Sequence, residues 1–486
     1  MRIRVATAAA ALLVAGLTPF ALPTPATAAS AKYADDFNGD GYRDLVVAAP
    51  QATVSGHEAA GAVVVLYGTS SGPSATKRKL ITQASTGIPG SPETADHFGG
   101  SVASADLDLD GYADLVVGTP DEDTDGAFNK GSVTVVWGSA QGLGSGTVLP
   151  LTYGAGDPSG CAFGVDLAAV PVSPAPRPWI HIAGGCSVWT LQGPITRTGK
   201  AYSRSERMSE RIQGPSTEKI VTGRLSDNYS DQIEVSVPLS DHPMGAVYIN
   251  RVSSSNPQPL STDASNATVG DVNGDGYGDL VLGDPGDMTV DGTPQEGTGH
   301  DGGQIAIWPG SAQGIDPAAQ PILINQSTPG VPGSSESHDT FGTDVTVADL
   351  NHDGFGDIAV GAPGETLGSA RQAGEVVIVP GGPDGPTGAG SYAITQNSTG
   401  VPGTAEHGDA FGTTVRFADL TKDGRADLVV GTPGELAPGA TRSTGGIWVF
   451  KGTSTGVSLG SSYSVMAGTV GLPTTSDTNW SSVLAP

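Results

Sequence analysis

Short apolar runs ending in Pro recur along the chain, each directly behind an acidic turn. The runs read LVVAAP from residue 45, LVVGTP from 115, LVLGDP from 280, IAVGAP from 358 and LVVGTP from 428. Runs of this length, rich in β-branched residues and bounded by Gly and Pro, predict buried strands. The preceding turn has the pattern D-x-[DNT]-x-D-G-x-x-D in all five places. Turn and strand therefore belong to one repeating unit.

A fuller unit emerges when the copies are overlaid. Phe-Gly and a short alternating strand come first, at Phe98, Phe341 and Phe411, and the acidic turn and apolar strand follow. A third strand of the type G-x-V-x-V and a Gly-marked turn come next, and a fourth short strand leads to the next unit. The third strands are Gly61–Leu66, Gly131–Val136, Gly303–Ile307, Gly374–Val379 and Gly446–Val449. Four antiparallel strands per unit, repeated many times, predict an all-β propeller.

The spacing of the turns gives the number of blades. The turns start 70 or 78 residues apart, except for the 165 residues between Asp106 and Asp271. That gap holds two degenerate units. One opens at Phe163-Gly164-Val165-Asp166 and has Trp179–Ala183 as its second strand, and the other keeps only Asp227 and Asp231 before Ile233–Pro238. We therefore predict seven blades, with six as the fallback.

The two ends of the repeat region indicate a closed ring. The first unit begins almost at its acidic turn and lacks a Phe-Gly strand, whereas the chain ends with Asn479-Trp480-Ser481-Ser482-Val483 where such a strand would stand. We expect the C-terminal strand to complete the first blade, which removes the exposed edges of an open array.

Over residues 33–486 the motifs resemble the FG-GAP repeats of the integrin α-subunit β-propeller and of bacterial secreted relatives. The resemblance rests on Phe-Gly, the Asp turn and Gly-Ala-Pro at 361–363. It implies a seven-bladed propeller with Ca²⁺ in the loops that join strands 1 and 2 on the lower face. It also implies ligand contacts on the upper face, from the 2–3 and 4–1 loops. Two units lack the loop ligands and no integrin leg or transmembrane segment is expected to follow, so the resemblance does not imply membership of a heterodimeric receptor.

The acidic turns predict about five Ca²⁺ sites. Positions one, three, five and nine would supply side-chain oxygens and position seven its backbone carbonyl, while Gly at position six allows the sharp turn. The expected ligands are Asp36, Asn38, Asp40, Tyr42, Asp44; Asp106, Asp108, Asp110, Tyr112, Asp114; Asp271, Asn273, Asp275, Tyr277, Asp279; Asp349, Asn351, Asp353, Phe355, Asp357; and Asp419, Thr421, Asp423, Arg425, Asp427. Thr421 makes the last site the poorest. The alternative is a set of solvated acidic turns without metal.

Two further acidic patterns fall in loops that would share the upper face. E-x-x-D-x-F-G places Glu93 and Asp96, Glu336 and Asp339, and Glu406 and Asp409 in the 4–1 loops, and Glu122, Asp287, Glu365 and Glu435 follow Pro in the 2–3 loops. They would either line a binding rim or cap turns. A basic group, Arg197, Lys200, Arg204, Arg207 and Arg211, would be either an anion-docking site or a solvated face.

Composition and the N-terminus indicate export. Residues 1–28 have the charged start, the short apolar stretch and the Ala26-Thr27-Ala28 site of a secretory signal, which leaves residues 29–486 as one propeller domain. The apolar stretch is broken by Pro19 and Pro23, so we expect no membrane span. A formal charge of −27 argues against nucleic acid as a partner. We expect a secreted, extracellular and monomeric protein.

Two cysteines, Cys161 and Cys186, are present. In an exported protein a disulfide is expected, with two free thiols as the alternative. If the strands around Val170 and Trp179 are antiparallel neighbours, their register brings Cys161 close to Cys186.

The patterns predict a binding protein and not an enzyme. The chain has no H-E-x-x-H or G-x-S-x-G motif, and no residues remain for a separate catalytic domain. We expect calcium-dependent extracellular recognition or adhesion, with an unidentified protein or glycan as ligand. One alternative is a polysaccharide-active lyase or hydrolase that uses carboxylates such as Glu93, Glu122 and Glu365 at the central channel. The other is a cell-wall scaffold without a discrete ligand.

Overall fold

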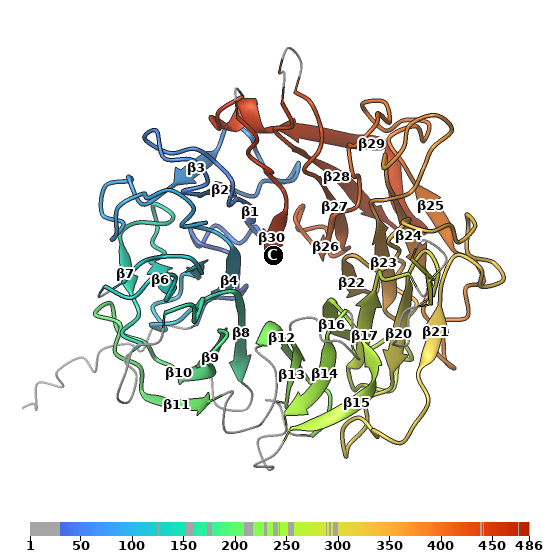
Figure 1. The fold of residues 1–486 in the computed structure, drawn as a ribbon, viewed down its shortest axis with the longest axis horizontal. Coiled ribbons are helices and arrows are strands. Elements are labelled where there is room, and N and C mark those ends of the chain that lie inside the picture. The colour runs from blue at the N-terminus through green and yellow to red at the C-terminus, as the bar shows by residue number, and fades with distance from the viewer. Residues whose placement is uncertain are drawn as a thin grey trace, which may run out of the picture.

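The computed structural model describes residues 30–124, 126–151, 159–172, 177–208, 217–227, 231–236, 242, 244–250, 257–287, 289–290, 293–294, 300–437, 440, 442–474 and 476–485. Across these residues the chain forms seven four-stranded antiparallel sheets around a central axis, as predicted (Figure 1). The expected signal at 1–28 lies outside the described residues. The described part of the chain contains no helix with the length and apolar character of a membrane-spanning segment.

The strands follow the chain blade by blade, and their bounds are as follows. Blade 1 contains β1 (Leu45–Ala49), β2 (Ala62–Leu66), β3 (Arg78–Ile81) and β30 (Val483–Ala485). Blade 2 contains β4 (Ser101–Ala105), β5 (Asp114–Thr119), β6 (Ser132–Val136) and β7 (Gly146–Val148). Blade 3 contains β8 (Asp166–Val172), β9 (Arg177–Ala183), β10 (Ser187–Gln192) and β11 (Ser203–Met208). Blade 4 contains β12 (Thr217–Gly223), β13 (Asp231–Ser236), β14 (Ala246–Asn250) and β15 (Gln258–Asp263).

The remaining three blades keep the same order. Blade 5 contains β16 (Asn266–Gly270), β17 (Asp279–Asp284), β20 (Gln304–Trp308) and β21 (Ile322–Ile324), with a small hairpin of β18 (Thr289–Val290) and β19 (Thr293–Pro294). Blade 6 contains β22 (Val345–Ala348), β23 (Asp357–Ala362), β24 (Glu375–Val379) and β25 (Tyr392–Ile394). Blade 7 contains β26 (Thr414–Ala418), β27 (Asp427–Thr432), β28 (Gly446–Thr453) and β29 (Gly456–Met466), and the 3₁₀ helix η2 (Ala467–Val470) follows it.

The antiparallel order fixes which loops share a face. The innermost strands β30, β4, β8, β12, β16, β22 and β26 stand next to one another around the axis (Figure 1). Because successive strands reverse direction, the 1–2 and 3–4 loops lie at one end of every blade and the 2–3 and 4–1 loops at the other. We call these ends the lower face and the upper face.

The second strands are continuously apolar because both of their faces are buried. In β1, Leu45 and Val47 pack with blade 7 residues such as Val429, whereas Val46 and Ala48 pack with blade 2 residues such as Leu115. Alternate side chains thus enter two different inter-blade cores. A charged residue in such a strand would face one of these cores without a partner.

The ring closes as the sequence predicts. β30 pairs with β1, with Val46 opposite Ala485 and Ala48 opposite Val483. Trp480, just before this strand, is fully buried between blades 1 and 7. The C-terminal segment therefore occupies the place of the missing Phe-Gly strand.

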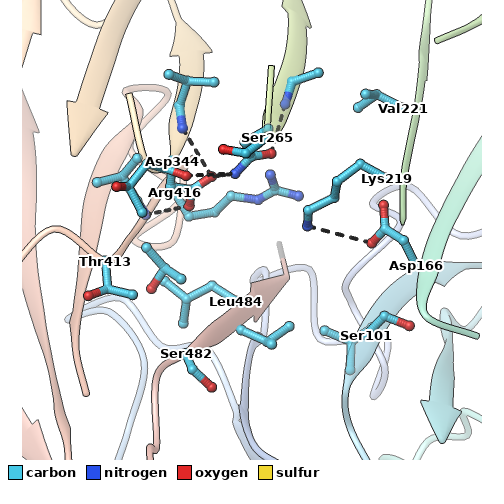
Figure 2. Close-up of a pocket in the computed structure, with 18 of the residues that line it drawn as sticks. Ser101, Asp166, Lys219, Val221, Ser265, Asp344, Thr413, Arg416, Ser482 and Leu484 are labelled. Atoms are coloured by element: carbon cyan, nitrogen blue, oxygen red, sulfur yellow. Dashed lines mark hydrogen bonds and ion pairs between the residues drawn. The ribbon is translucent and has the colours of Figure 1, made fainter. Parts of the chain in front are cut away.

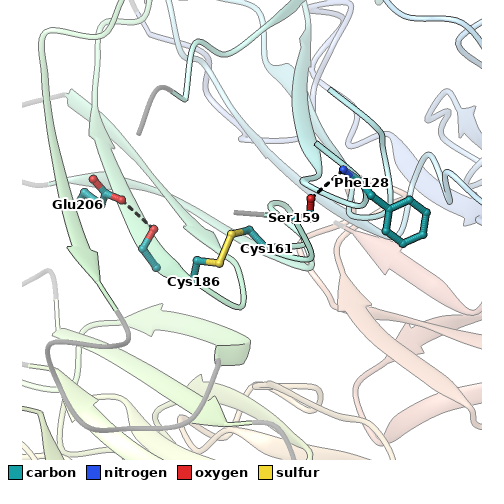
Figure 3. Close-up of a disulfide and its surroundings, with 6 residues drawn as sticks. Phe128, Ser159, Cys161, Cys186 and Glu206 are labelled. Carbon is teal, nitrogen blue, oxygen red and sulfur yellow. Dashed lines mark hydrogen bonds between the residues drawn. A yellow bond between two sulfur atoms is a disulfide. The ribbon is translucent and has the colours of Figure 1, made fainter. Parts of the chain in front are cut away.

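The degenerate third blade is held by the predicted disulfide. β8 and β9 pair with Val170 opposite Trp179 and Asp166 opposite Ala183. Just beyond the end of this ladder, Cys161 and Cys186 are bonded with their Cα atoms 5.0 Å apart (Figure 3). The disulfide prediction and the placement of the third blade are both confirmed.

Candidate functional site

The five acidic loops lie on the lower face and share one backbone arrangement. In every loop the first Asp accepts the N–H of the sixth residue, Gly, through Oδ2 at 2.8–3.1 Å. The fifth Asp accepts the N–H of the seventh residue through Oδ1, also at 2.8–3.1 Å. These bonds curl each loop so that the carboxylates at positions one and five are tied into the same turn.

The ninth Asp anchors each loop to its own blade. Its Oδ2 accepts the N–H of the second loop residue at 2.9–3.1 Å. Its Oδ1 accepts the N–H of a Gly in the 3–4 turn, at 2.8–3.2 Å. Burial raises the pKa of Asp44 and Asp114 to about 8 and that of Asp279 and Asp357 to about 6. Burial thus disfavours the ionised form of these carboxylates unless a cation balances their charge.

In the 106–114 and 419–427 loops, an oxygen at an expected ligand position is buried without a hydrogen-bond partner in the described structure, which fits a hard cation. One carboxylate oxygen each from Asp106, Asp108 and Asp114 lies within 4.8 Å of the others. Asp108 Oδ1 is buried and has no hydrogen-bond partner among the described residues. The Thr421 hydroxyl, at the same third position of the last loop, is likewise buried without a partner in the described structure. Orphaned oxygens at the expected ligand position are what a Ca²⁺ site would use.

Arg197 adds a cation to the second acidic loop. Its Nε donates to Asp108 Oδ2 at 2.8 Å and its guanidinium also donates to Asp110 Oδ2 at 2.7 Å. Of the other basic residues that the sequence groups with it, Arg204 donates to the Pro150 carbonyl at 3.4 Å and Lys200 is exposed. Arg211 and the side chain of Arg207 lie outside the described residues. Of the described members, Arg197 is therefore engaged by the carboxylates of the acidic loop.

On the upper face, the turn-capping interpretation holds for the Asp residues of the 4–1 loops. Asp96, Asp339 and Asp409 each accept the N–H of the Glu three positions earlier at 2.6 Å. In the 2–3 loops, Asp287 lies 2.8 Å from Nδ1 of His338. The hydrogen bonds to Asp287 hold its pKa below the usual value, although its burial acts in the opposite direction.

Three glutamines that the sequence analysis missed link these acidic loops. Gln83, Gln326 and Gln396 are buried and donate through Nε2 to Glu122, Glu365 and Glu435, at 2.6, 2.8 and 2.8 Å respectively. Each pair is separated by 39 residues along the chain. This constant spacing, together with a Ser-Thr pair shortly after each Gln, was the available signal.

The central channel holds charges of both signs. A cavity of about 380 Å³ is lined by the innermost strands. Within it Lys219 Nζ lies 3.7 Å from Asp166 Oδ1, and the side chain of Arg416 extends into the same space near Asp344 (Figure 2). Glu93, Glu122 and Glu365 are not among the residues lining this cavity. The acid–base pair of the enzyme alternative is therefore not placed at the channel.

Comparison with known proteins places the repeats in a family. The model of the FG-GAP repeat matches residues 33–66, 98–136, 341–379 and 411–450, which contain four of the five acidic loops. Phosphatidylinositol-glycan-specific phospholipase D of Dictyostelium discoideum is 33% identical over 177 residues, covering 36% of this chain and 18% of that protein. The Homo sapiens protein of the same name is 36% identical over 107 residues, covering 22% and 13%.

An integrin shows a longer match. Integrin alpha-5 of Xenopus laevis is 30% identical over 226 residues, covering 44% of this chain and 19% of the integrin. The chain thus spans only about a fifth, or less, of the length of these relatives. The chain carries four FG-GAP repeats in a seven-bladed β-propeller and is homologous, over part of its length, to integrin alpha subunits.

Proposed function

We propose that the chain is a secreted, calcium-binding propeller that acts as a monomer in extracellular recognition or adhesion. Residues 1–28 would be removed as the signal, and residues 29–486 would form the mature domain. Each acidic loop would hold one Ca²⁺ through positions one, three, five and nine and the carbonyl of position seven. The bound ion would supply the positive charge that the buried carboxylates lack, and the chain's own residues would bind and orient it.

The observation that carries this proposal is the shared geometry of the five loops, with buried ligand-position oxygens left unpaired at Asp108 and Thr421. An unpaired buried oxygen costs free energy unless a ligand satisfies it. Solvated turns without metal would instead leave such oxygens in contact with water. The geometry therefore favours metal binding over the alternative of acidic turns alone.

The upper face offers a surface for a protein or glycan ligand. Phe128, in the 2–3 loop of blade 2, has 67% of its surface exposed. Its backbone N–H donates to Ser159 Oγ at 3.2 Å, close to the disulfide of blade 3 (Figure 3). An exposed aromatic ring on a loop held in this way suits stacking on a sugar or contact with an apolar side chain.

Binding is favoured over catalysis by the positions of the carboxylates. Glu93 and Glu122 belong to blade 2, whereas Glu365 belongs to blade 6, so the three do not converge on one substrate. The phospholipase D relatives are enzymes by name, and the matched segments are a minor part of their length. We infer that the similarity to them reflects the shared repeats.

The test is a screen of glycans and extracellular proteins against the mature chain at 1 mM Ca²⁺ and in EDTA. We expect binding that requires Ca²⁺ and weakens about tenfold in Phe128→Ala, the loss typical of an exposed aromatic contact. Tyr202→Ala is the matched control, because Tyr202 is 65% exposed but lies on the outer part of blade 3. Ligand binding that is equal with and without Ca²⁺ would contradict the proposal.

A further inference from the structure

Four carboxylates gather on the upper face at blade 6. Glu336 and Asp339 come from the 4–1 loop before β22, Glu365 from the 2–3 loop, and Glu375 is the first residue of β24. One carboxylate oxygen each from Glu336, Asp339 and Glu365 lies within 4.8 Å of the other two. Glu375 lies beside them, because it shares the side-chain amide of Gln326 with Glu365. We call the four carboxylate residues together with Gln326 the blade 6 cluster.

Among the residues that the structure describes, the negative charge of the blade 6 cluster has no basic partner. No described lysine or arginine lies within ion-pairing distance of its four carboxylates. The nearby His338 is turned to Asp287, 2.8 Å away. The cluster therefore needs protons or a bound cation to balance its charge.

Gln326 supplies an independent sign of a ligand. The side chain is only 3% exposed, and its Nε2 donates to Glu365 at 2.8 Å and to Glu375 at 3.1 Å. Its Oε1 is buried and has no hydrogen-bond partner in the described part of the chain. A buried amide oxygen without a partner costs free energy, and such an oxygen is a good ligand for a hard cation. The carboxamide oxygen of Gln326 thus adds an unused neutral oxygen ligand to the four carboxylates.

Two related clusters show what is special at blade 6. The groups around Gln83 in blade 2 and Gln396 in blade 7 have the same glutamine–glutamate bond, and their glutamine oxygens are also unpaired in the described structure. At the position of Glu375, however, blade 2 has Ser132 and blade 7 has Gly446. Among the described residues, a set of three converging carboxylate oxygens occurs on this face only in the blade 6 cluster. The fourth carboxylate and this convergence distinguish it.

We propose that the blade 6 cluster binds one hard divalent cation, Ca²⁺ where calcium is millimolar, through Glu336, Asp339, Glu365, Glu375 and Gln326 Oε1. Carboxylate and amide oxygens in this number suit Ca²⁺, which takes six to eight oxygen ligands, with water completing the shell. The ion joins the 4–1 loop to the 2–3 loop of the upper face. No residue of the five acidic loops takes part, so this site does not depend on the proposed lower-face sites.

The experiment counts bound Ca²⁺ by native mass spectrometry and equilibrium dialysis at pH 7.5. We expect the double variant Glu336→Gln/Glu365→Gln to bind one Ca²⁺ fewer than the wild-type chain. The matched control, Glu406→Gln/Glu435→Gln in blade 7, keeps the wild-type count. Equal counts in the wild type and the blade 6 variant would overturn the proposal. If the acidic loops bind no metal, both counts fall but their difference of one remains, so the two proposals fail separately.

A milder variant guards against loss of folding. Glu336 is exposed, so Glu336→Gln removes one ligand charge without disturbing a buried contact. We expect it to weaken one Ca²⁺-binding step at least tenfold in a calorimetric titration and to leave the remaining steps unchanged. An unchanged titration in a folded Glu336→Gln chain would equally overturn the site.

Discussion

Arg197 joins the third blade to the acidic loop of the second. Its guanidinium bonds to Asp108, Asp110 and the Gly138 carbonyl, at 2.8, 2.7 and 3.2 Å. The 106–114 loop has four carboxylates where each of the other four loops has three. One arginine therefore leaves this loop with three uncompensated carboxylates, as in the 271–279 and 349–357 loops. Because Arg197 bonds to Oδ2 of Asp108, Oδ1 keeps no hydrogen-bond partner in the described structure and could bind a metal.

Replacing Arg197 by Ala should destabilise the calcium-free protein more than the calcium-bound protein. Without metal, Arg197 is the cation that offsets the four carboxylates, whereas bound Ca²⁺ takes over this role. We expect a loss of roughly 0.5–1 kcal/mol in EDTA and less in 5 mM Ca²⁺, since the arginine side chain is 48% exposed. Urea unfolding in both buffers measures this, with Arg204→Ala as control. An equal loss in the two buffers would show that Arg197 does not serve the loop.

His181 gives blade 3 a specific sensitivity to acid. It lies fully buried on β9, its Nδ1 is 3.0 Å from Thr190 Oγ1, and burial lowers its pKa to about 4. The pKa of an unfolded histidine is about 6.5. Because the folded value is lower, the histidine's contribution is complete above pH 6.5 and is lost as the pH falls towards 4.

The matching prediction compares wild type with His181→Gln in urea at pH 7 and pH 4.5. The wild type should lose about 2 to 3 kcal/mol more than the variant between these pH values, because only the wild type must protonate a buried imidazole. His338→Gln, which changes a largely exposed histidine, serves as control. Parallel losses in wild type and His181→Gln would contradict the assignment.

At the scale of elements, the sequence predicts the strands well and the side-chain contacts between loops poorly. The second strands are predictable because both faces are buried, so the whole run is apolar, as in β1 and β27. Even the degenerate blades 3 and 4 were placed, because Phe163-Gly164 and the Trp179–Ala183 strand keep the pattern. The disulfide followed from the same register. Local spacing was enough for each of these.

The links between loops were not predictable in this way. The bonds of Gln326 join residues 39 and 49 positions apart, and Arg197 reaches a loop 89 positions earlier. The contact of Arg197 depends on how neighbouring blades are stacked, which no local pattern encodes, whereas the glutamine–glutamate pairs left only their constant 39-residue spacing as a signal. The repeat reveals the acidic loops because all of their ligands lie within nine residues. The repeat does not reveal the blade 6 cluster, because a carboxylate stands at the position of Glu375 in blade 6 but not in blades 2 and 7.

The closing strand is an element whose removal can be tested. Trp480→Ala should lower the free energy of unfolding by about 3–5 kcal/mol, since the indole is fully buried between blades 7 and 1. A chain ending at Thr478 would also leave the edge of β1 unpaired and should aggregate. Adding a peptide of residues 479–486 should restore a soluble, cooperatively melting protein. Phe128→Ala is the exposed-aromatic control, and a Trp480→Ala chain as stable as this control would refute the sealing role.

At the scale of the whole molecule, the acidic loops also touch one another across blades. A Cβ on Gly39 of blade 1 would come within 2.6 Å of the Tyr112 ring of blade 2, so the glycine allows the two loops to pack. Tyr277 of blade 5 donates to Asp227 of blade 4 at 3.1 Å, and Lys422 of blade 7 lies 4.9 Å from the Tyr42 ring of blade 1. The metal binding that we propose for one loop would therefore support the neighbouring blade as well.

Calcium removal should consequently weaken the ring as a unit. At 1 mM Ca²⁺ and a dissociation constant near 0.1 mM, each site contributes about 1.4 kcal/mol by linkage, or about 7 kcal/mol for five sites. We expect EDTA to lower the Tm by at least several degrees in one cooperative transition, since adjacent loops share contacts. Differential scanning calorimetry with elemental analysis measures this, and added Mg²⁺ should restore little, because its octahedral shell fits these loops poorly. An unchanged Tm in EDTA, with no metal in the purified protein, would show that the loops hold the ring together by their hydrogen bonds alone.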